Sequence, residues 1–138
     1  KKTHLIYYAS KEGSKGWFKE MEKKYKTKKN ETLKWGIESA EFAGWGLINP
    51  INIDIKNNRA ILSITKSRFV ECYGKSKEPV DDMMRGFIAG GASLQFGTNV
   101  EAVETKCLAK GNSHCEIIVK QKKEFDKSNP LVKKQLGL

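Results

Sequence analysis

The spacing of the apolar residues changes near residue 44, and this change restricts the fold more than any other feature of the sequence. Over residues 5–43, apolar side chains recur three or four positions apart, as on one face of a helix. From residue 51 they alternate with polar side chains, as on a half-buried strand. The chain is therefore predicted to pack helices against a separate antiparallel sheet, which is an α+β fold.

Two helical regions are expected before the change. The first runs from Leu5 to Tyr25, where Gly13 and Gly16 allow either one bent helix or two short ones. The second follows Asn30, a suitable N-cap residue, and ends at the glycines that flank Trp45.

Two β-hairpins are expected after it. Isoleucines alternate with polar residues over residues 51–55, Asn57–Asn58 suits a tight turn, and the alternation resumes over residues 60–64. Residues 100–108 and 115–120 form the second hairpin, joined by a loop that contains Gly111. Together the hairpins predict a twisted antiparallel sheet with the helices packed on it.

A glycine-rich helix lies between the hairpins. Glu78, Pro79, Asp81 and Asp82 are expected in its first turn, where proline and acidic residues are favourable. Its apolar stripe consists of Met84, Phe87, Ile88 and Leu94. A second stripe holds small residues: Gly86, Gly90, Ser93 and Gly97. Such glycines indicate that another backbone packs closely, as in helix-on-sheet packing, or that space is left for a ligand or a second copy of the chain.

Cys107 and Cys115 lie symmetrically about Gly111. Across an antiparallel hairpin centred there, their Cβ atoms would be about 4.5 to 5.5 Å apart. Three interpretations stay open: two reduced cysteines in the core, a shared metal ion, or a disulfide. The third cysteine, Cys72, makes the total odd, so at least one thiol is left over.

Charge and length exclude several classes of protein. The net charge of +10 comes from the two ends, because residues 35–120 sum to zero. Only three of the 26 basic residues are arginine, so specific nucleic-acid binding is not expected. With 138 residues and no apolar run of about 18, we expect one domain over residues 1–138 without a membrane-spanning helix. Residues 121–138 resemble a surface tail, and the first residue, Lys1, indicates a fragment or trimmed chain.

The segment from Pro79 to Gly90, followed by Glu104–Cys107 and Gly111–Cys115, resembles the 4-vinyl reductase domain family. The resemblance implies a small-molecule-binding domain of the superfamily shared by NO-signalling and Golgi-transport proteins, usually a dimer. Its relatives include sensor domains of hydrocarbon-responsive transcription activators, proteins of bacteriochlorophyll vinyl reduction and subunits of vesicle-tethering complexes.

The resemblance also implies a structural zinc site. Glu104, Cys107 and Cys115 match three zinc ligands of the sensor relatives, and Asp81 falls where those relatives have a cysteine. Carboxylate oxygen also binds zinc, and Cys72 or His114 could replace Asp81 as the fourth ligand. In a regular strand Glu104 and Cys107 point to opposite faces, so Glu104 joins the site only through a bulge or strong twist.

The leading hypothesis is a cytoplasmic, homodimeric module that binds a small apolar or aromatic molecule and could act as a stand-alone sensor. The expected pocket residues are Trp45, Phe69, Tyr73, Met84, Phe87 and Ile88. The alternatives are an enzyme related to tetrapyrrole vinyl reductases and a vesicle-tethering-like adaptor without a ligand. No catalytic, nicotinamide or flavin motif is evident, so catalysis is the less favoured alternative. If the chain is complete, signalling passes through a separate partner.

Overall fold

The computed structural model describes the backbone of residues 2–138 and the side chains from His4 onward. Over this range the chain forms five α-helices, two short 3-10 helices and four strands. In chain order they are α1 (Lys2–Tyr25), α2 (Lys29–Phe42), β1 (Leu47–Asp54), β2 (Arg59–Thr65), α3 (Arg68–Tyr73), α4 (Asp82–Phe96), β3 (Glu101–Lys106), η1 (Leu108–Lys110), β4 (Cys115–Lys120), η2 (Lys122–Glu124) and α5 (Pro130–Leu136).

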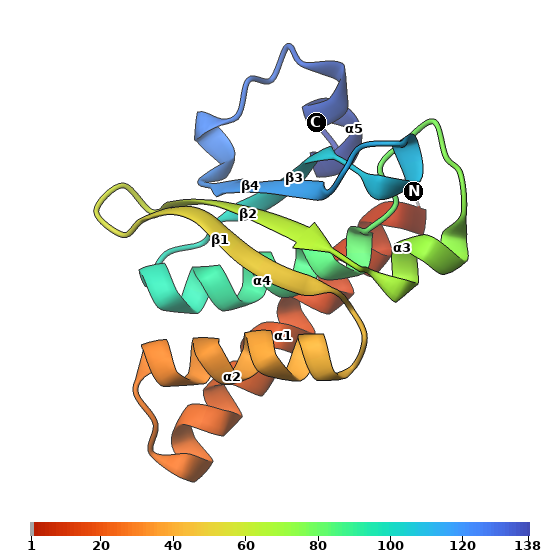
Figure 1. Cartoon of the computed structure of the whole chain (residues 1–138). Coiled ribbons are helices and arrows are strands. Elements are labelled where there is room, and N and C mark those ends of the chain that lie inside the picture. Colours follow the sequence, from red (N-terminus) through yellow and green to blue (C-terminus); the bar gives the residue numbers. More distant parts are fainter. Residues whose placement is uncertain (1) are drawn as a thin grey trace.

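The strands form one open antiparallel sheet in the order β1-β2-β4-β3. Helices α1, α2 and α4 lie on one face of this sheet, and α5 lies on the other (Figure 1). The main hydrophobic core fills the space between the sheet and the helices of the first face. The predicted α+β class, with an antiparallel sheet made from two hairpins, is confirmed.

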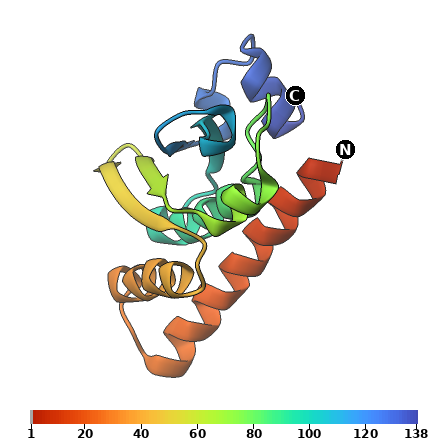
Figure 2. The same ribbon diagram turned by 45° about the vertical axis from the view of Figure 1, so that its right-hand side comes forward.

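The small residues of α4 let it approach α1 closely (Figure 2). A Cβ added to Gly86 would overlap the carbonyl oxygen of Tyr7, and one added to Gly90 would overlap that of Lys11. The predicted close backbone contact is confirmed, but the neighbour is a helix and not the sheet. Gly97 has a different part: it ends α4 in the left-handed conformation, with φ of 67°.

The two N-terminal helices settle two open points. α1 is one continuous helix, and an added Cβ would meet open space at both Gly13 and Gly16. The cap of α2 is Lys28, whose backbone N–H donates to the Glu31 carboxylate at 2.8 Å. The expected cap at Asn30 is wrong, because this hydrogen bond starts the helix earlier and Asn30 lies inside it.

The strands of the first hairpin differ in burial. The alternating residues of β2 are buried, as expected, and Asn58 turns the chain with φ of 54°. β1 is an edge strand with a β-bulge between Pro50 and Asn52. Ile51 lies at this bulge and Ile55 in the turn, and both are more than half exposed. The half-buried strand expected for residues 51–55 is therefore wrong for these two isoleucines.

Helix α4 begins at Asp82, later than the sequence indicates. Asp81 is its N-cap, with Oδ1 accepting the backbone N–H of Met84 at 3.3 Å. Glu78 and Pro79 precede the helix, so the expected first turn with proline and three carboxylates is wrong. The Asp81 carboxylate replaces them as the group that stabilises the helix start.

The C-terminal segment does more than run over the surface. It forms the expected short helix, α5, with Asn129 as N-cap. Phe125, Val132 and Leu136 are buried and form a second hydrophobic cluster with Val103 of β3. The expected surface tail at residues 121–138 therefore contributes buried residues, which cover the second face of the sheet.

Candidate functional site

A bulge in the second hairpin turns Glu104 toward the cysteines. The pairing of β3 with β4 shifts just after Glu104, as the sequence requires if this residue is to join Cys107. Beyond β3 the loop turns at Gly111, with φ of 90°, and Asn112 Oδ1 accepts the backbone N–H of Cys107 at 3.0 Å. These local contacts hold Cys107 near Cys115, the first residue of β4.

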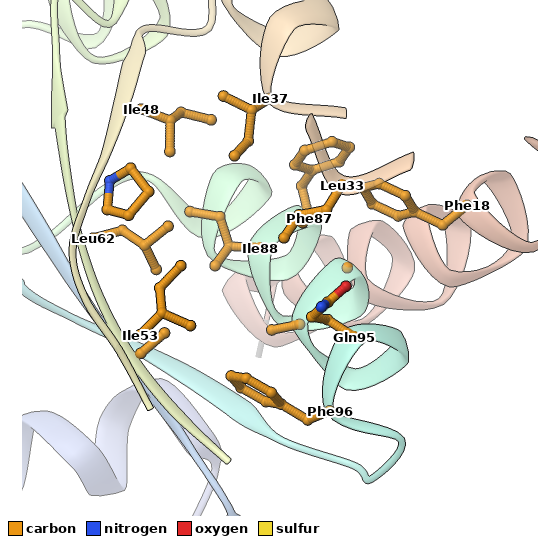
Figure 3. Close-up of a pocket in the computed structure, with 14 residues that line it drawn as sticks. Phe18, Leu33, Ile37, Ile48, Ile53, Leu62, Phe87, Ile88, Gln95 and Phe96 are labelled. Carbon is orange, nitrogen blue, oxygen red and sulfur yellow. The ribbon is translucent and has the colours of Figure 1, made fainter. Parts of the chain in front are cut away.

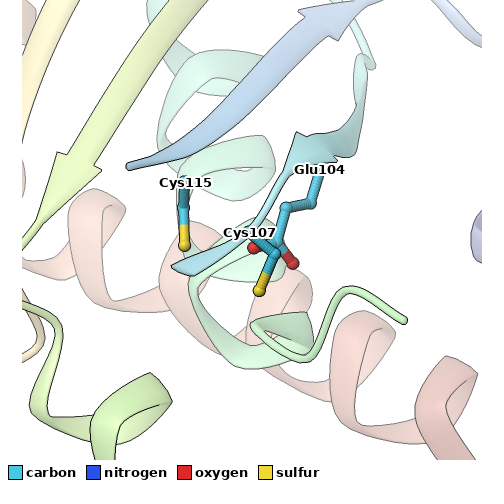
Figure 4. A group of neighbouring side chains, drawn as sticks. All are labelled: Glu104, Cys107 and Cys115. Carbon is cyan, nitrogen blue, oxygen red and sulfur yellow. The ribbon is translucent and has the colours of Figure 1, made fainter. Parts of the chain in front are cut away.

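Three potential ligand atoms converge at this end of the hairpin. A carboxylate oxygen of Glu104 and the Sγ atoms of Cys107 and Cys115 all lie within 4.8 Å of one another. The three side chains are buried and point into one space (Figure 4). Both cysteines are free, and the backbone N–H of Leu108 donates to Cys115 Sγ at 3.3 Å. Glu104, Cys107 and Cys115 can therefore hold a metal ion between them.

Asp81 lies beside this cluster but is not one of the three residues that converge. Its backbone N–H donates to Glu104 Oε2 at 3.1 Å. Its Oδ2 and the Glu104 Oε1 are both buried without a hydrogen-bond partner. Buried oxygens of this kind are rare in folded proteins and are compensated by water, a proton or a cation.

The cluster concentrates acidic groups in a space shielded from water. Burial raises the pKa of Glu104 to about 8 and that of Asp81 to about 7. A hydrogen bond from the Cys115 thiol lowers the pKa of Cys107 to about 5, and the same hydrogen bond raises the pKa of Cys115. Since a cation would stabilise every ionised form, the cluster is electrostatically suited to one.

The two substitute ligands lie elsewhere. Cys72 is exposed on α3. The ring of His114 is hydrogen-bonded to Ser113 Oγ at 2.9 Å on the exposed side of the hairpin. Neither residue belongs to the group that converges with Cys107, so the expectation that one of them completes the site finds no support in this geometry.

A second candidate site is a cavity of about 50 Å³ between the sheet, α2 and α4 (Figure 3). Thirteen of its fourteen lining residues are apolar, and Gln95 is the exception. Helix α4 supplies six of them: Phe87, Ile88, Gly91, Ala92, Gln95 and Phe96. The rest come from α1, α2, β1 and β2, so the cavity lies where the layers of the fold meet.

Two of the six expected pocket residues, Phe87 and Ile88, line this cavity. Trp45 packs edge-to-face on Phe87, with ring centroids 5.4 Å apart, and lies behind the cavity wall. Met84 is buried in the core one helical turn before Ile88 and does not reach the cavity.

Phe69 and Tyr73 are not in the lining. Both lie on α3 and are 44% and 62% exposed. Placing them in the pocket is wrong for this cavity, because the short helix α3 turns Val70 into the core and leaves its neighbours in solvent.

The sequence analysis missed Gln95 and the wall formed by α2 and β1. Gln95 follows Ile88 by seven positions, so the helical repeat that identified Ile88 could have found it. The wall residues Leu33 and Ile48 carry no such signal, since only the packing of α2 and β1 brings them to α4.

Comparison with known proteins identifies the region that carries both features. The family model of the 4-vinyl reductase domain matches residues 60–121. The phenol regulator MopR of Acinetobacter guillouiae is 33% identical over 61 residues, which make up 44% of this chain. The chain spans only 11% of the length of that regulator.

Three solved structures share the fold. The phenol-responsive sensory domain of the transcription activator PoxR, crystallised with phenol, has a TM-score of 0.71 at 18% identity and covers 90% of this chain and 66% of its own. A vinyl-4-reductase family protein from Methanocaldococcus jannaschii has a TM-score of 0.63 at 20% identity, over 83% and 66% of the two chains. A trafficking protein particle complex subunit 3 from Naegleria fowleri, covalently bound to palmitic acid, has a TM-score of 0.61 at 14% identity, over 86% and 78%.

At these identities the structural likeness shows the fold alone. The matched region holds β2, the glycine-spaced helix α4 and the cysteine hairpin, which are the elements on which the resemblance in the sequence rests. Residues 60–121 are thus a 4-vinyl reductase domain, of the family that the sequence resembles.

Proposed function

We propose that the chain is a sensor module that binds a small apolar or aromatic molecule in the cavity between the sheet, α2 and α4. The observation that carries this proposal is the cavity itself, in which thirteen of fourteen lining residues are apolar. Sites for small apolar molecules are built in this way, at the meeting of structural layers. The phenol regulator and the phenol-responsive domain among the relatives support it.

The cavity must widen to hold a ring. An apolar cavity of about 150 Å³ accepts benzene, and the present one measures about 50 Å³. Its outer wall is the part of the fold most able to move, because β1 is an edge strand with a bulge and Ile53 in that wall is 44% exposed. We expect a ligand to enter by displacing β1 and α2 from α4.

Titration with phenol tests this proposal. Wild-type protein is expected to melt at a higher temperature as phenol is added, and the fluorescence of Trp45, which touches the wall residue Phe87, is expected to change. Ala92→Leu fills the cavity from α4 and is expected to abolish both effects. Phe69→Leu, on the exposed face of α3, is the matched control and should bind like wild type. Equal binding by wild type and Ala92→Leu would place the ligand elsewhere.

The acidic cluster supports a structural zinc site, held by Glu104, Cys107 and Cys115 with Asp81 as the fourth ligand. Its two thiols and its unpartnered carboxylate oxygens are ligand types that zinc accepts. Bound there, zinc would supply positive charge that stabilises the ionised groups and links α4 to the hairpin. Four protein ligands leave no position for a reactive water, so this zinc would be structural.

Elemental analysis tests the zinc site. Wild-type protein is expected to carry about one zinc per chain, and Cys107→Ser is expected to lose it. Cys72→Ser, which changes the exposed cysteine of α3, should keep it. Asp81→Asn distinguishes a ligand from a helix cap, because asparagine is an equally good N-cap but a poorer metal ligand. Full zinc in Cys107→Ser would contradict the assignment.

The homodimer, the cytoplasmic location and the adaptor function stay predictions. Leu5, Ile6 and Trp17 form an exposed apolar surface on α1, which favours contact with another chain. Light scattering of wild type and Ile6→Glu would test this surface, since a charge in a self-contact should produce monomers. Over residues 2–138, the helices lack the combination of length and apolar character that crossing a bilayer requires.

A further inference from the structure

The cavity contains one polar group that the rest of the protein leaves unsatisfied. Among the described residues, four buried side-chain oxygens or nitrogens lack a hydrogen-bond partner. Two of these atoms belong to the acidic cluster at Asp81 and Glu104, and a third to Glu124, whose other oxygen pairs with Arg59. The fourth is Oε1 of Gln95, which lies in the wall of the apolar cavity.

An unpartnered amide oxygen in such a place is costly. Leaving a buried polar atom without a hydrogen bond costs about 1–3 kcal/mol. A leucine or methionine at this position would complete the apolar lining without that cost. Gln95 occurs on the face of α4 that Ile88 and Ala92 also present to the cavity, and Figure 3 shows its side chain on the α4 side of the lining residues. The amide is thus within reach of a molecule in the cavity.

We propose that Gln95 determines the specificity of the cavity, and that the ligand is a compact neutral molecule carrying one hydroxyl group, an alcohol or a phenol. This inference rests on the proposed ligand-binding function and deepens it. A hydroxyl both donates and accepts, so it pairs with the Gln95 amide whichever way the oxygen and nitrogen are oriented. A pure hydrocarbon leaves the amide unpaired and therefore binds more weakly.

The rest of the lining excludes charged ligands. It contains no ionisable side chain, and its other thirteen residues are apolar. A carboxylate or ammonium group would lose its hydration there and gain no opposite charge in return. The recognised class is therefore neutral, with an apolar body facing the isoleucines and phenylalanines and a hydroxyl at Gln95.

The test compares phenol, benzene and benzoate, which share one ring and differ in the polar group. Wild-type protein is expected to bind phenol at least about tenfold more tightly than benzene in calorimetric or fluorescence titrations, since a hydrogen bond to the amide is worth about 1 kcal/mol or more. Benzoate is expected not to bind. In Gln95→Met the preference for phenol should disappear because benzene binds more tightly and phenol more weakly.

Two further readouts separate recognition from a structural role. Gln95→Met should be at least as stable as wild type in urea, because the substitution removes an unsatisfied amide and no hydrogen bond. Gln121→Met, which lies outside the cavity, should keep the wild-type preference. Equal affinity of wild type for phenol and benzene, retained preference in Gln95→Met, or tight benzoate binding would overturn the inference alone. Failure of every ring to bind would overturn the proposed function and the inference with it.

Discussion

The backbone N–H of Asp81 donates to Glu104 Oε2 at 3.1 Å and so ties the start of α4 to strand β3. Each of these residues also has one buried carboxylate oxygen without a partner. The contact joins the helix that lines the apolar cavity to the hairpin that carries the cysteines. The acidic cluster and the cavity are therefore at two places along one rigid element, α4.

Zinc binding to the cluster should strengthen with rising pH. In the metal-free protein burial raises the pKa of Glu104 to about 8 and that of Asp81 to about 7, so both carboxyls are largely protonated at about pH 6. Protons then compete with the metal, and affinity should rise between about pH 6 and about pH 8 as they dissociate. Competition titrations with a zinc indicator across this range measure the change.

The variant Glu104→Gln separates the carboxylate from the thiols in this prediction. It removes the group with the higher carboxyl pKa, so zinc should bind more weakly and with a smaller pH dependence. Glu116→Gln, on β4 but outside the cluster, is the control and should behave like wild type. The same steep pH dependence in Glu104→Gln would mean that Glu104 is not a ligand.

Gly86→Ala should destabilise the fold by about 2 kcal/mol. Its Cβ would overlap the backbone of α1 at the Tyr7 carbonyl, which cannot move without displacing the helix. The helix-propensity gain of about 1 kcal/mol is too small to offset this. Gly16→Ala is the matched control, because its Cβ meets open space, and it should stabilise the protein by about 0.5–1 kcal/mol. Urea denaturation measures both, and equal effects would show that α1 and α4 are not in close contact.

The secondary structure followed from local patterns wherever a repeat was long enough. The alternation around Leu62 and the glycines of α4 predicted the first hairpin and a close backbone contact, and the structure contains both. Neither pattern identifies the partner of a helix face, so the contact with α1 was not foreseen. The burial of Ile51 was also wrong, because the position of a strand at a sheet edge depends on the order of all four strands.

The cysteine cluster was predictable because its geometry is local. Cys107 and Cys115 are joined by one short loop, and the bulge after Glu104 was a requirement that the sequence itself stated. The cavity was not, since residues such as Leu33 and Ile48 are far apart in the sequence and meet only through tertiary packing. Aromatic residues such as Tyr73 suggested a pocket by type, but type does not determine which side of a helix faces inward.

A buried polar network connects α1, α4 and β3 on the side of α4 away from the cavity. The Tyr7 hydroxyl donates to Glu101 Oε2 at 2.6 Å and accepts the backbone N–H of Ala102 at 2.9 Å. Lys11 forms an ion pair with the other oxygen of Glu101 at 2.8 Å, and both side chains are almost fully buried. Arg85 of α4 lies over the Tyr7 ring, 4.3 Å from its centroid. One phenol hydroxyl thus serves two buried groups of β3.

Tyr7→Phe should therefore destabilise the protein by about 2–3 kcal/mol. The variant keeps the ring under Arg85 but leaves the Ala102 N–H unpaired and removes one of the two hydrogen-bonding partners of the buried Glu101 carboxylate. Burial raises the pKa of Tyr7, so the hydroxyl stays protonated and the loss should be constant from about pH 5 to about pH 9. Tyr8→Phe, the neighbouring tyrosine with 37% exposure, is the control and should change the free energy of unfolding by less than about 0.5 kcal/mol. Urea denaturation at several pH values measures both variants, and a Tyr7→Phe protein as stable as wild type would show that the network adds nothing to the fold.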